Sequence, residues 1–274
     1  MRLTEAQLDA REQALAAVAR EAGELARSLY TNFEKSGIKM KGQQDFVTAA
    51  DSEVERAIIA RLAASFPHDA FLAEEGGASG SGDATWIIDP IDGTANFAHG
   101  IPHFCVSIAL LSRGELALGA IAAPMYHELY LARRGRGAFL NGKPMRVSAV
   151  SDMREAIIEL GWSARRPARA YTALLERVLA TGATFMRAGS GALGLAYVAD
   201  GRTQGYCELH INSWDAAAGL LLVSEAGGWC NDFLAADGLS RGNPVLACAP
   251  GLTPALVAAT GVGQVNGKLE RRMS

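Results

Sequence analysis

An apolar strand pattern that runs directly into two aspartates constrains this chain more than any other feature of its sequence. Residues 86–97 read WIIDPIDGTANF, so the Trp-Ile-Ile run would be buried while Asp89 and Asp92 follow at once. Two carboxylates this close repel each other unless a metal ion or a basic side chain lies between them, or both face water. The fold must therefore supply one of these environments at the end of a buried strand.

The residues around the two aspartates predict how the strand ends. Pro90 has no N–H and restricts Asp89, so we expect the strand to break there. Gly93 permits a tight turn, and Thr94 is a candidate N-cap for a following helix. Two acids at the end of a strand beside a helix N-terminus suit a divalent cation bound to a phosphate. A lone aspartate would more often be a turn cap or a solvated loop acid, but the pair favours a site.

A similar pattern occurs in haloacid-dehalogenase phosphatases, where a strand is followed by D-x-D-G-T and the first aspartate is the nucleophile. In this chain two residues, instead of one, separate Asp89 from Asp92. The side chains would therefore be placed differently. The spacing favours two metal ligands over an aspartyl-phosphate enzyme.

Further acids lie at the predicted ends of other elements. Glu74 and Glu75 end a short strand, Asp51 lies at a strand-to-helix junction, and Asp215 starts a helix. Each acid alone would be interpreted as a cap or a surface residue, because Asp and Glu favour first helical turns. Their common position at element ends suggests that they converge. An all-oxygen ligand set of this kind favours Mg²⁺.

Three other patterns indicate different chemistry less strongly. His99 and His103 are four residues apart, a spacing that would suit a zinc pair on a helix. The intervening Gly-Ile-Pro forbids a helix, so the zinc interpretation is weak. Residues 189–194 match G-x-G-x-x-G, but a dinucleotide site needs an acid about 20 residues later, and Glu208 comes too early. We prefer a turn that lets a substrate approach the backbone. Ser163 lacks a G-x-S-x-G elbow, which argues against a serine hydrolase. The remaining histidines, expected to be structural, are His68, His127 and His210.

Composition excludes several classes of protein. The 274 residues are 49% hydrophobic with a net charge of −3, enough for a large core and without the basic footprint of a nucleic-acid-binding protein. A phosphate-bearing substrate would need local positive charge from a metal or from backbone N–H groups. The four cysteines form no C-x-x-C pair, and we expect free thiols. Neither a signal peptide nor a stretch of about 20 apolar residues is visible, so we expect a soluble, cytoplasmic protein without a membrane partner.

Periodicity predicts a mixed α/β chain without a linker that would force a domain boundary. A helix is expected over 5–33, and residues 45–66 should begin extended and become helical near Asp51. The later elements are strands near 70–75, 85–89, 103–112, 115–125 and 128–135, a hairpin at Asn141-Gly142, a strand at 156–163, a helix at 167–181, a strand–turn–helix unit at 184–201, a strand at 205–211 and a helix at 214–228.

Taken together, these motifs resemble the inositol monophosphatase family. The matching segments are Asp45–Asp51, Glu74-Glu75, Trp86–Thr94 and Trp214–Gly219, and the likeness extends from the first helix to about residue 250. The resemblance implies a layered αβαβα sandwich of the inositol monophosphatase and fructose bisphosphatase type. It implies one domain over 1–274, with a metal-binding half at about 1–148 and an α/β half at about 149–274.

The resemblance also implies an activity and a set of site residues. It implies a homodimer that hydrolyses small phosphate monoesters with two or three Mg²⁺ ions, often inhibited by lithium. The implied ligands are Glu74, Asp89 and the Ile91 carbonyl for one ion, Asp89, Asp92 and Asp215 for a second, and Glu74 through water for a weaker third. Asp51 and Thr94 would orient the attacking water, and the N–H groups of Gly93 and Thr94 would bind the phosphate. The implied substrate contacts are Glu208, Ala192 and Ser163.

The sequence departs from the family pattern at the substrate rim. Trp162 stands where relatives often have a small residue, and Gly191 replaces a frequent threonine. We therefore expect a phosphatase in which metal-activated water acts without a covalent intermediate, with inositol monophosphate as the leading substrate. The alternatives are histidinol phosphate, fructose bisphosphate and a nucleotide phosphate. Some bacterial relatives take part in transcription complexes, but no basic patch or tail encodes such a role.

Overall fold

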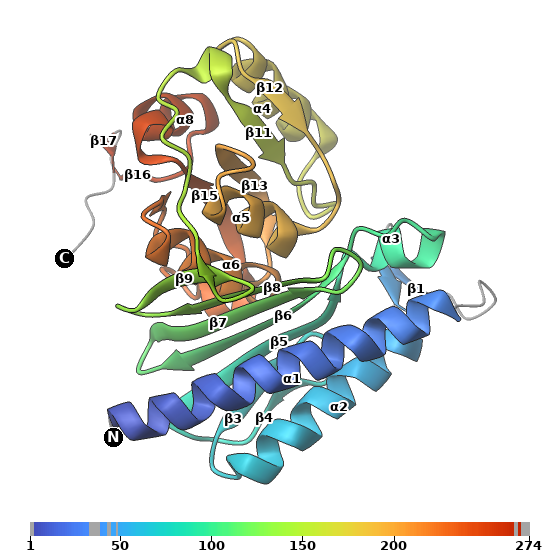
Figure 1. Cartoon of the computed structure of the whole chain (residues 1–274). Helices are drawn as coiled ribbons and strands as arrows, with labels where there is room; N and C mark the ends of the chain where they lie inside the picture. Colours follow the sequence, from blue (N-terminus) through green and yellow to red (C-terminus); the bar gives the residue numbers. More distant parts are fainter. Residues whose placement is uncertain (1–2, 33–38, 43–44, 48, 266–267, 270–274) are drawn as a thin grey trace.

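Helical and sheet layers alternate in the order αβαβα in the computed structural model of the chain (Figure 1). The structure describes residues 3–32, 39–42, 45–47, 49–265 and 268–269. The layered fold implied by the family resemblance is therefore confirmed.

The first helical layer is a pair of helices that lie side by side on one face of the larger sheet (Figure 1). Helix α1 (Glu5–Thr31) begins with a capping box in which the Thr4 side chain accepts from the Gln7 N–H. Helix α2 (Ala49–Ser65) packs beside it. Residue 33, the predicted end of the first helix, lies outside the described residues.

The larger sheet has eight strands in the order β10-β9-β8-β7-β6-β5-β3-β4. All neighbours are antiparallel except β3 and β5. Its strands are β3 (Ala70–Ala73), β4 (Gly77–Ser79), β5 (Ala84–Asp92), β6 (Cys105–Ser112), β7 (Glu115–Ala123), β8 (Glu128–Arg133), β9 (Gly137–Leu140) and β10 (Lys143–Pro144).

An ion cluster fixes the start of α1 to the sheet. Arg133 on β8 is 5% exposed, and its guanidinium pairs with Glu5 at 2.7 Å, Asp9 at 2.5 Å and Glu12 at 2.7 Å. The three acids occupy one face of the helix, because residues three and four positions apart are neighbours. A buried guanidinium needs such partners, since an unpaired charge in the interior is costly.

Strand β5 does not end at Pro90, so the predicted break is wrong. The strand continues to Asp92, and its register against β6 shifts between Asp89, opposite Ser107, and Asp92, opposite Cys105. A bulge of this kind tolerates proline, because a residue there need not donate to the ladder. The bulge leaves both aspartates on a buried strand.

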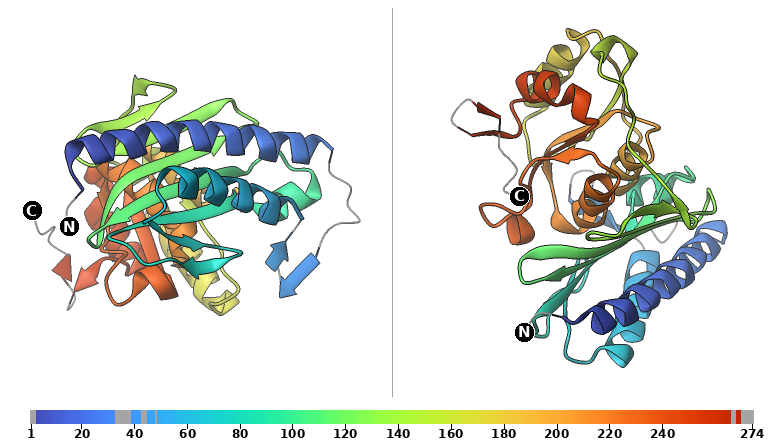
Figure 2. Two further views of the ribbon diagram at one scale, coloured as in Figure 1. Left: turned by 90° about the horizontal axis from the view of Figure 1, so that it is seen from below. Right: turned by 60° about the vertical axis from the view of Figure 1, so that its left-hand side comes forward.

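The middle layer consists of α5 (Gly191–Ala199) and α6 (Ser213–Glu225), which lie between the two sheets (Figure 2). The two helices can approach closely because Gly219 of α6 has no side chain. A Cβ at that position would lie only 2.4 Å from the Leu195 Cβ of α5. On the sheet side, a Cβ on Gly119 of β7 would lie 3.0 Å from the Ala218 carbonyl oxygen. Two glycines thus let α6 pack tightly on both sides.

The second sheet has the strand order β12-β11-β13-β15-β14. Strand β11 runs parallel to β12 and β13, and β15 runs antiparallel to β13 and β14. Helices α4 (Ala168–Leu179) and α8 (Thr253–Thr260) close the outer face with an apolar cluster that includes Leu174 and Leu256. The strands are β11 (Ile157–Leu160), β12 (Thr184–Met186), β13 (Gly205–Ile211), β14 (Trp229–Cys230) and β15 (Asn243–Cys248).

Short elements complete the chain. They are β1 (Lys39–Gly42), β2 (Asp45–Val47), α3 (Thr94–His99), the 3₁₀ turns Met153–Glu155 and Pro250–Leu252, α7 (Gly238–Arg241), β16 (Gln264–Val265) and β17 (Lys268–Leu269). The predicted hairpin is confirmed, with positive φ at Asn141 and Gly142. The four cysteines are free, as expected. Among the described residues, no helix combines the length and apolarity needed to cross a membrane.

Candidate active site

A cavity of about 510 Å³ lies where the end of β5 meets the first turns of α3, α5 and α6. It brings together many residues that the sequence singled out. Those on its wall are Glu74, Asp92, Gly93, Thr94, Ser163, Glu208 and Asp215. The candidate site is thus assembled from both halves of the chain.

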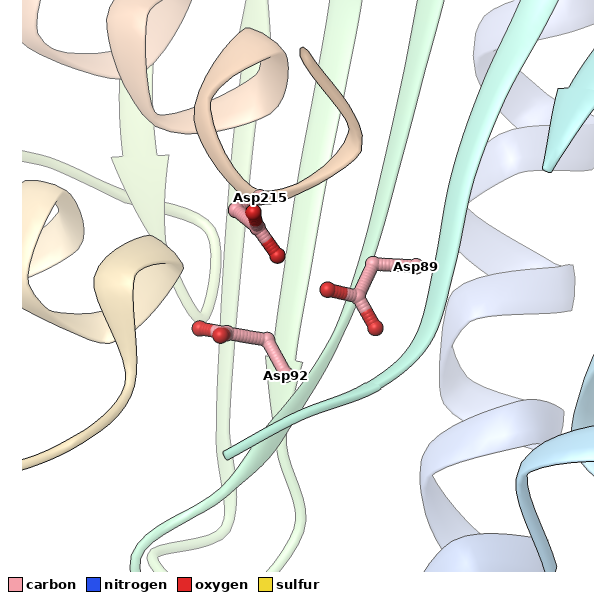
Figure 3. Close-up of side chains that lie close together, drawn as sticks. All are labelled: Asp89, Asp92 and Asp215. Atoms are coloured by element: carbon pink, nitrogen blue, oxygen red, sulfur yellow. The ribbon is translucent and has the colours of Figure 1, made fainter. Parts of the chain in front are cut away.

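Three aspartates form the centre of this site. Asp89 and Asp92 come from β5, and Asp215 lies in the first turn of α6. Each offers one carboxylate oxygen, and these atoms all lie within 4.8 Å of one another. Figure 3 shows the three carboxylates converging on the space between the strand and the helix. The convergence expected from the sequence therefore holds for these acids.

The start of α5 fixes the carboxylate of Asp92. The Ser190 hydroxyl and the Ala192 N–H, at 2.7 Å, both donate to Asp92 Oδ2, while the Gly191 N–H donates to Oδ1 at 3.3 Å. Free N–H groups at a helix N-terminus favour negative charge. Both oxygens of Asp92 therefore accept from protein donors, and one of them also lies within 4.8 Å of an oxygen each of Asp89 and Asp215.

Backbone donors also hold the other two aspartates. The Ile91 N–H donates to Asp89 Oδ1 at 3.0 Å, and the Asn212 N–H donates to Asp215 Oδ2 at 3.1 Å. Asp215 closes a capping box at the start of α6. These backbone bonds fix the orientation of both carboxylates at the mouth of the cluster.

Burial raises the pKa of every acid in the cluster. For Asp92, burial and the charge of Asp215 raise the pKa to about 7. Burial, with repulsion between neighbouring carboxylates, also raises the pKa of Glu74 and Asp89, and burial raises that of Asp215. Among the residues whose side chains the structure describes, no lysine or arginine forms an ion pair with these four acids. Such a concentration of charge fits a divalent cation.

We expect the stability of the metal-free protein to fall as pH rises from 5 to 8. The unfolded-state pKa of an aspartate such as Asp92 is about 4, and the folded value is about 7. The folded state therefore binds the proton more tightly, so this stabilisation is complete below pH 4 and is lost as pH rises through 7. Thermal unfolding in EDTA across this range measures it.

Added Mg²⁺ should act in the opposite direction. A cation binds the deprotonated acids, so the rise in Tm at pH 8 should exceed the rise at pH 5. The raised pKa values of the acid cluster would be contradicted if the metal-free Tm stayed constant or increased over this pH range and Mg²⁺ raised the Tm equally at pH 5 and pH 8.

Thr94 is not the N-cap that its sequence position predicted. Gly93 occupies that position with φ +95°, and a Cβ there would lie 2.9 Å from the His103 carbonyl oxygen, so only glycine fits. Thr94 is the first residue of α3 instead. Its hydroxyl lies 2.9 Å from the Ile91 carbonyl oxygen and 3.3 Å from Asp51 Oδ1, and can donate to either. Thr94 therefore connects the end of β5 to the buried Asp51 of α2.

The opposite wall of the cavity carries the residues expected near a substrate. Glu208 of β13 accepts from the Tyr206 hydroxyl at 2.7 Å, and burial raises its pKa to about 8. Ser163 lies on the wall, as does Trp162, whose ring packs edge-on against Tyr171 at 5.4 Å. Ala192 is fully buried and does not line the cavity; its backbone N–H instead binds Asp92.

Sequence patterns missed several residues of this wall. His210 lines the cavity, although its sequence context indicated only a structural role. Glu159, Arg165, Arg187 and Ser190 also line it. The G-x-G-x-x-G match at 189–194 marked the turn that holds Ser190, but the pattern alone did not reveal that the turn grips an aspartate.

Several known proteins are similar to this chain over most of its length. Residues 7–260 match the model of the inositol monophosphatase family. The chain is 40% identical over 221 residues to "Nus factor SuhB" of Xylella fastidiosa, covering 80% of each protein. It is 44% identical over 199 residues to "Inositol-1-monophosphatase" of Rhizobium meliloti, covering 71% of this chain and 75% of that protein.

A solved structure supports the same likeness. The extragenic suppressor protein suhB from Bartonella henselae is 36% identical to this chain and superposes with a TM-score of 0.85. The match covers 92% of this chain and 98% of that protein. The sequence and structural comparisons therefore agree over nearly the whole fold.

Proposed function

Because the chain belongs to the inositol monophosphatase family, we propose that it is a Mg²⁺-dependent phosphatase that hydrolyses a small phosphate monoester. The observation that supports this most is the cluster of the buried Asp89 and Asp92 with the half-buried Asp215 beside an open cavity. Buried carboxylates are costly unless a cation or a donor compensates them. A metal-binding role explains why they are gathered here with no ion pair to a lysine or arginine in the described part of the chain.

The donor set fits Mg²⁺. All candidate ligands are oxygens, which this hard cation prefers, and no histidine is among them. We propose that Glu74, Asp89 and the Ile91 carbonyl hold one ion, that Asp89, Asp92 and Asp215 hold a second, and that Glu74 contributes through water to a weaker third. When bound, such ions supply an acidified water and a polarised phosphate.

The protein's own groups would position the reactants. Thr94 directs its hydroxyl proton toward Asp51 or the Ile91 carbonyl, so its oxygen remains free to accept a hydrogen bond from the attacking water. The N–H groups of Gly93 and Thr94, at the start of α3, would bind the phosphate. The hydrolysis then needs no covalent intermediate.

Inositol monophosphate is the leading candidate substrate. With a pKa of about 8, Glu208 is largely protonated near neutral pH and can both donate to and accept from a polyol hydroxyl. Ser163 on the same wall offers a further hydroxyl contact. A cationic substrate such as histidinol phosphate would instead favour ionised Glu208. Fructose bisphosphate and nucleotide phosphates are further candidate substrates.

A panel of phosphate monoesters tests this proposal. Each compound is assayed with Mg²⁺, with Mg²⁺ and Li⁺ together, and with EDTA as the control. Inositol monophosphate should give the highest kcat/KM, and Li⁺ should lower it. Histidinol phosphate as the best substrate would favour a role for ionised Glu208, and failure to hydrolyse any monoester with Mg²⁺ would refute the phosphatase assignment.

A partner-binding role is the second candidate, and the relatives called Nus factor SuhB favour it. Such a role would not require the acid cluster, so a pull-down with a variant that lacks one of the acids separates binding from hydrolysis. The family resemblance also supports a homodimer acting in the cytoplasm. Sedimentation of the pure protein measures its oligomeric state.

A further inference from the structure

One buried carboxyl group of the cavity wall has no part in the proposed reaction. Glu159 lies on β11, is 1% exposed, and belongs to the sheet that does not carry Asp89 and Asp92. We propose that Glu159 is a positioning residue that holds the segment 187–192 in place and thereby orients the Asp92 carboxylate. The inference rests on the metal site of the proposed function, but it concerns metal affinity and not the identity of the substrate.

Glu159 holds the backbone N–H of Ala188. Its Oε1 accepts from the Ala188 N–H at 3.1 Å. On the other side, Asn96 Nδ2 donates to the Ala188 carbonyl oxygen at 3.0 Å and to the His103 carbonyl oxygen at 2.8 Å. Both polar groups of residue 188 are therefore held, one by the second sheet and one by α3.

The held peptide leads directly to the donors that grip Asp92. Gly189 turns the chain with φ +94°, and a Cβ there would lie 3.1 Å from Asn96 Nδ2. The next residues, Ser190 and Ala192, donate to Asp92 Oδ2. A shift of Ala188 would therefore move the donors, and the carboxylate would turn with them. Partners behind a metal ligand typically matter in this way, because they set the direction of its lone pairs.

The surroundings of Glu159 argue against direct substrate contact. Its Oε2 is buried and has no hydrogen-bond partner among the described residues. A Cβ on Gly194 would lie 3.0 Å from this oxygen, so α5 covers it closely. Burial also raises the pKa of Glu159 to about 7, so its charge is only partly present at neutral pH. The feature that matters is the acceptor at Oε1.

A pair of variants with similar shapes isolates that acceptor. Glu159→Gln keeps an oxygen for the Ala188 N–H, whereas Glu159→Met fills the same space without one. Calorimetric titration of each full-length protein with Mg²⁺, in the absence of substrate, should give nearly unchanged affinity for Gln and about 10-fold weaker affinity for Met. The matched control is Glu155→Met, because Glu155 is exposed and precedes the same strand.

Thermal unfolding in EDTA separates positioning from stability. A Met variant with a lower metal-free Tm and unchanged Mg²⁺ affinity would show that Glu159 only supports the fold, and would overturn the proposal. Equal losses of affinity in the Gln and Met variants would also overturn it, because charge would then be the relevant property. If the unaltered protein binds Mg²⁺ but hydrolyses no monoester, the proposed function fails while this inference stands.

Discussion

The Asp92→Asn variant is expected to fold normally and to lose at least about 100-fold in turnover. Asp92 Oδ2 already accepts from Ser190 and Ala192, so the asparagine oxygen should remain with those donors. The amide nitrogen would then take the place of Oδ1, where it loses only the long bond from the Gly191 N–H, and an amide nitrogen has no lone pair to offer a cation.

Stability should change in the opposite direction from activity. The substitution removes a buried carboxylate whose charge is disfavoured by burial and by Asp215. The metal-free Tm at pH 8 should therefore be equal to or higher than that of the unaltered protein, and the increase in Tm on adding Mg²⁺ should shrink. Turnover close to normal at saturating Mg²⁺ would contradict the assignment of Asp92 as a ligand.

A second large effect is expected at Thr94. Thr94→Ala should lower kcat by about 100-fold or more, which is the usual range for a side chain that takes part in proton transfer in the transition state. The hydroxyl is the only side-chain group of this residue that can reach Asp51 and the Ile91 carbonyl. Mg²⁺ affinity should stay close to normal, because the substitution changes no carboxylate.

The matched control for this prediction is Thr94→Ser, which keeps the hydroxyl and loses only a methyl group. Steady-state kinetics should show most of the activity restored in the serine variant. Equal losses in the alanine and serine variants would mean that the methyl group, through packing, matters more than the hydroxyl. Weaker Mg²⁺ binding in the alanine variant would instead place Thr94 with the metal ligands.

Much of the fold could be predicted from the sequence where periodicity and turn chemistry agree. The strand over 205–211, the helix that ends before Gly227 and the hairpin at Asn141-Gly142 all follow local rules. Pro90 shows where a local rule fails. Proline signals a strand end when every N–H is needed, but a bulge removes that need, and a bulge depends on the neighbouring strand β6.

The site shows the same division between local and distant information. Asp89 and Asp92 stand out because they follow an apolar run, and Asp215 because it begins a helix. Glu159 carries no such signal, and the glycine pattern around Ser190 indicated a turn without indicating its partner. Their importance arises from distant contacts, with Ala188 and Asp92 respectively, that only the packed sheets bring about. The N-cap position expected for Thr94 and the place on the cavity wall expected for Ala192 were wrong for the same reason, since each depends on a neighbouring element.

The separation of Asp89 and Asp215 along the chain has a consequence for biosynthesis. Asp215 is on a helix that packs between the two sheets, so it reaches β5 only after most of the polypeptide has been made and the sheets have closed around α6. A nascent or truncated chain lacking α6 would have no complete pocket for a cation. Only the complete, folded chain would then bind the proposed Mg²⁺. Because that binding stabilises the folded state, proteases would degrade the Mg²⁺-bound protein more slowly than the metal-free protein.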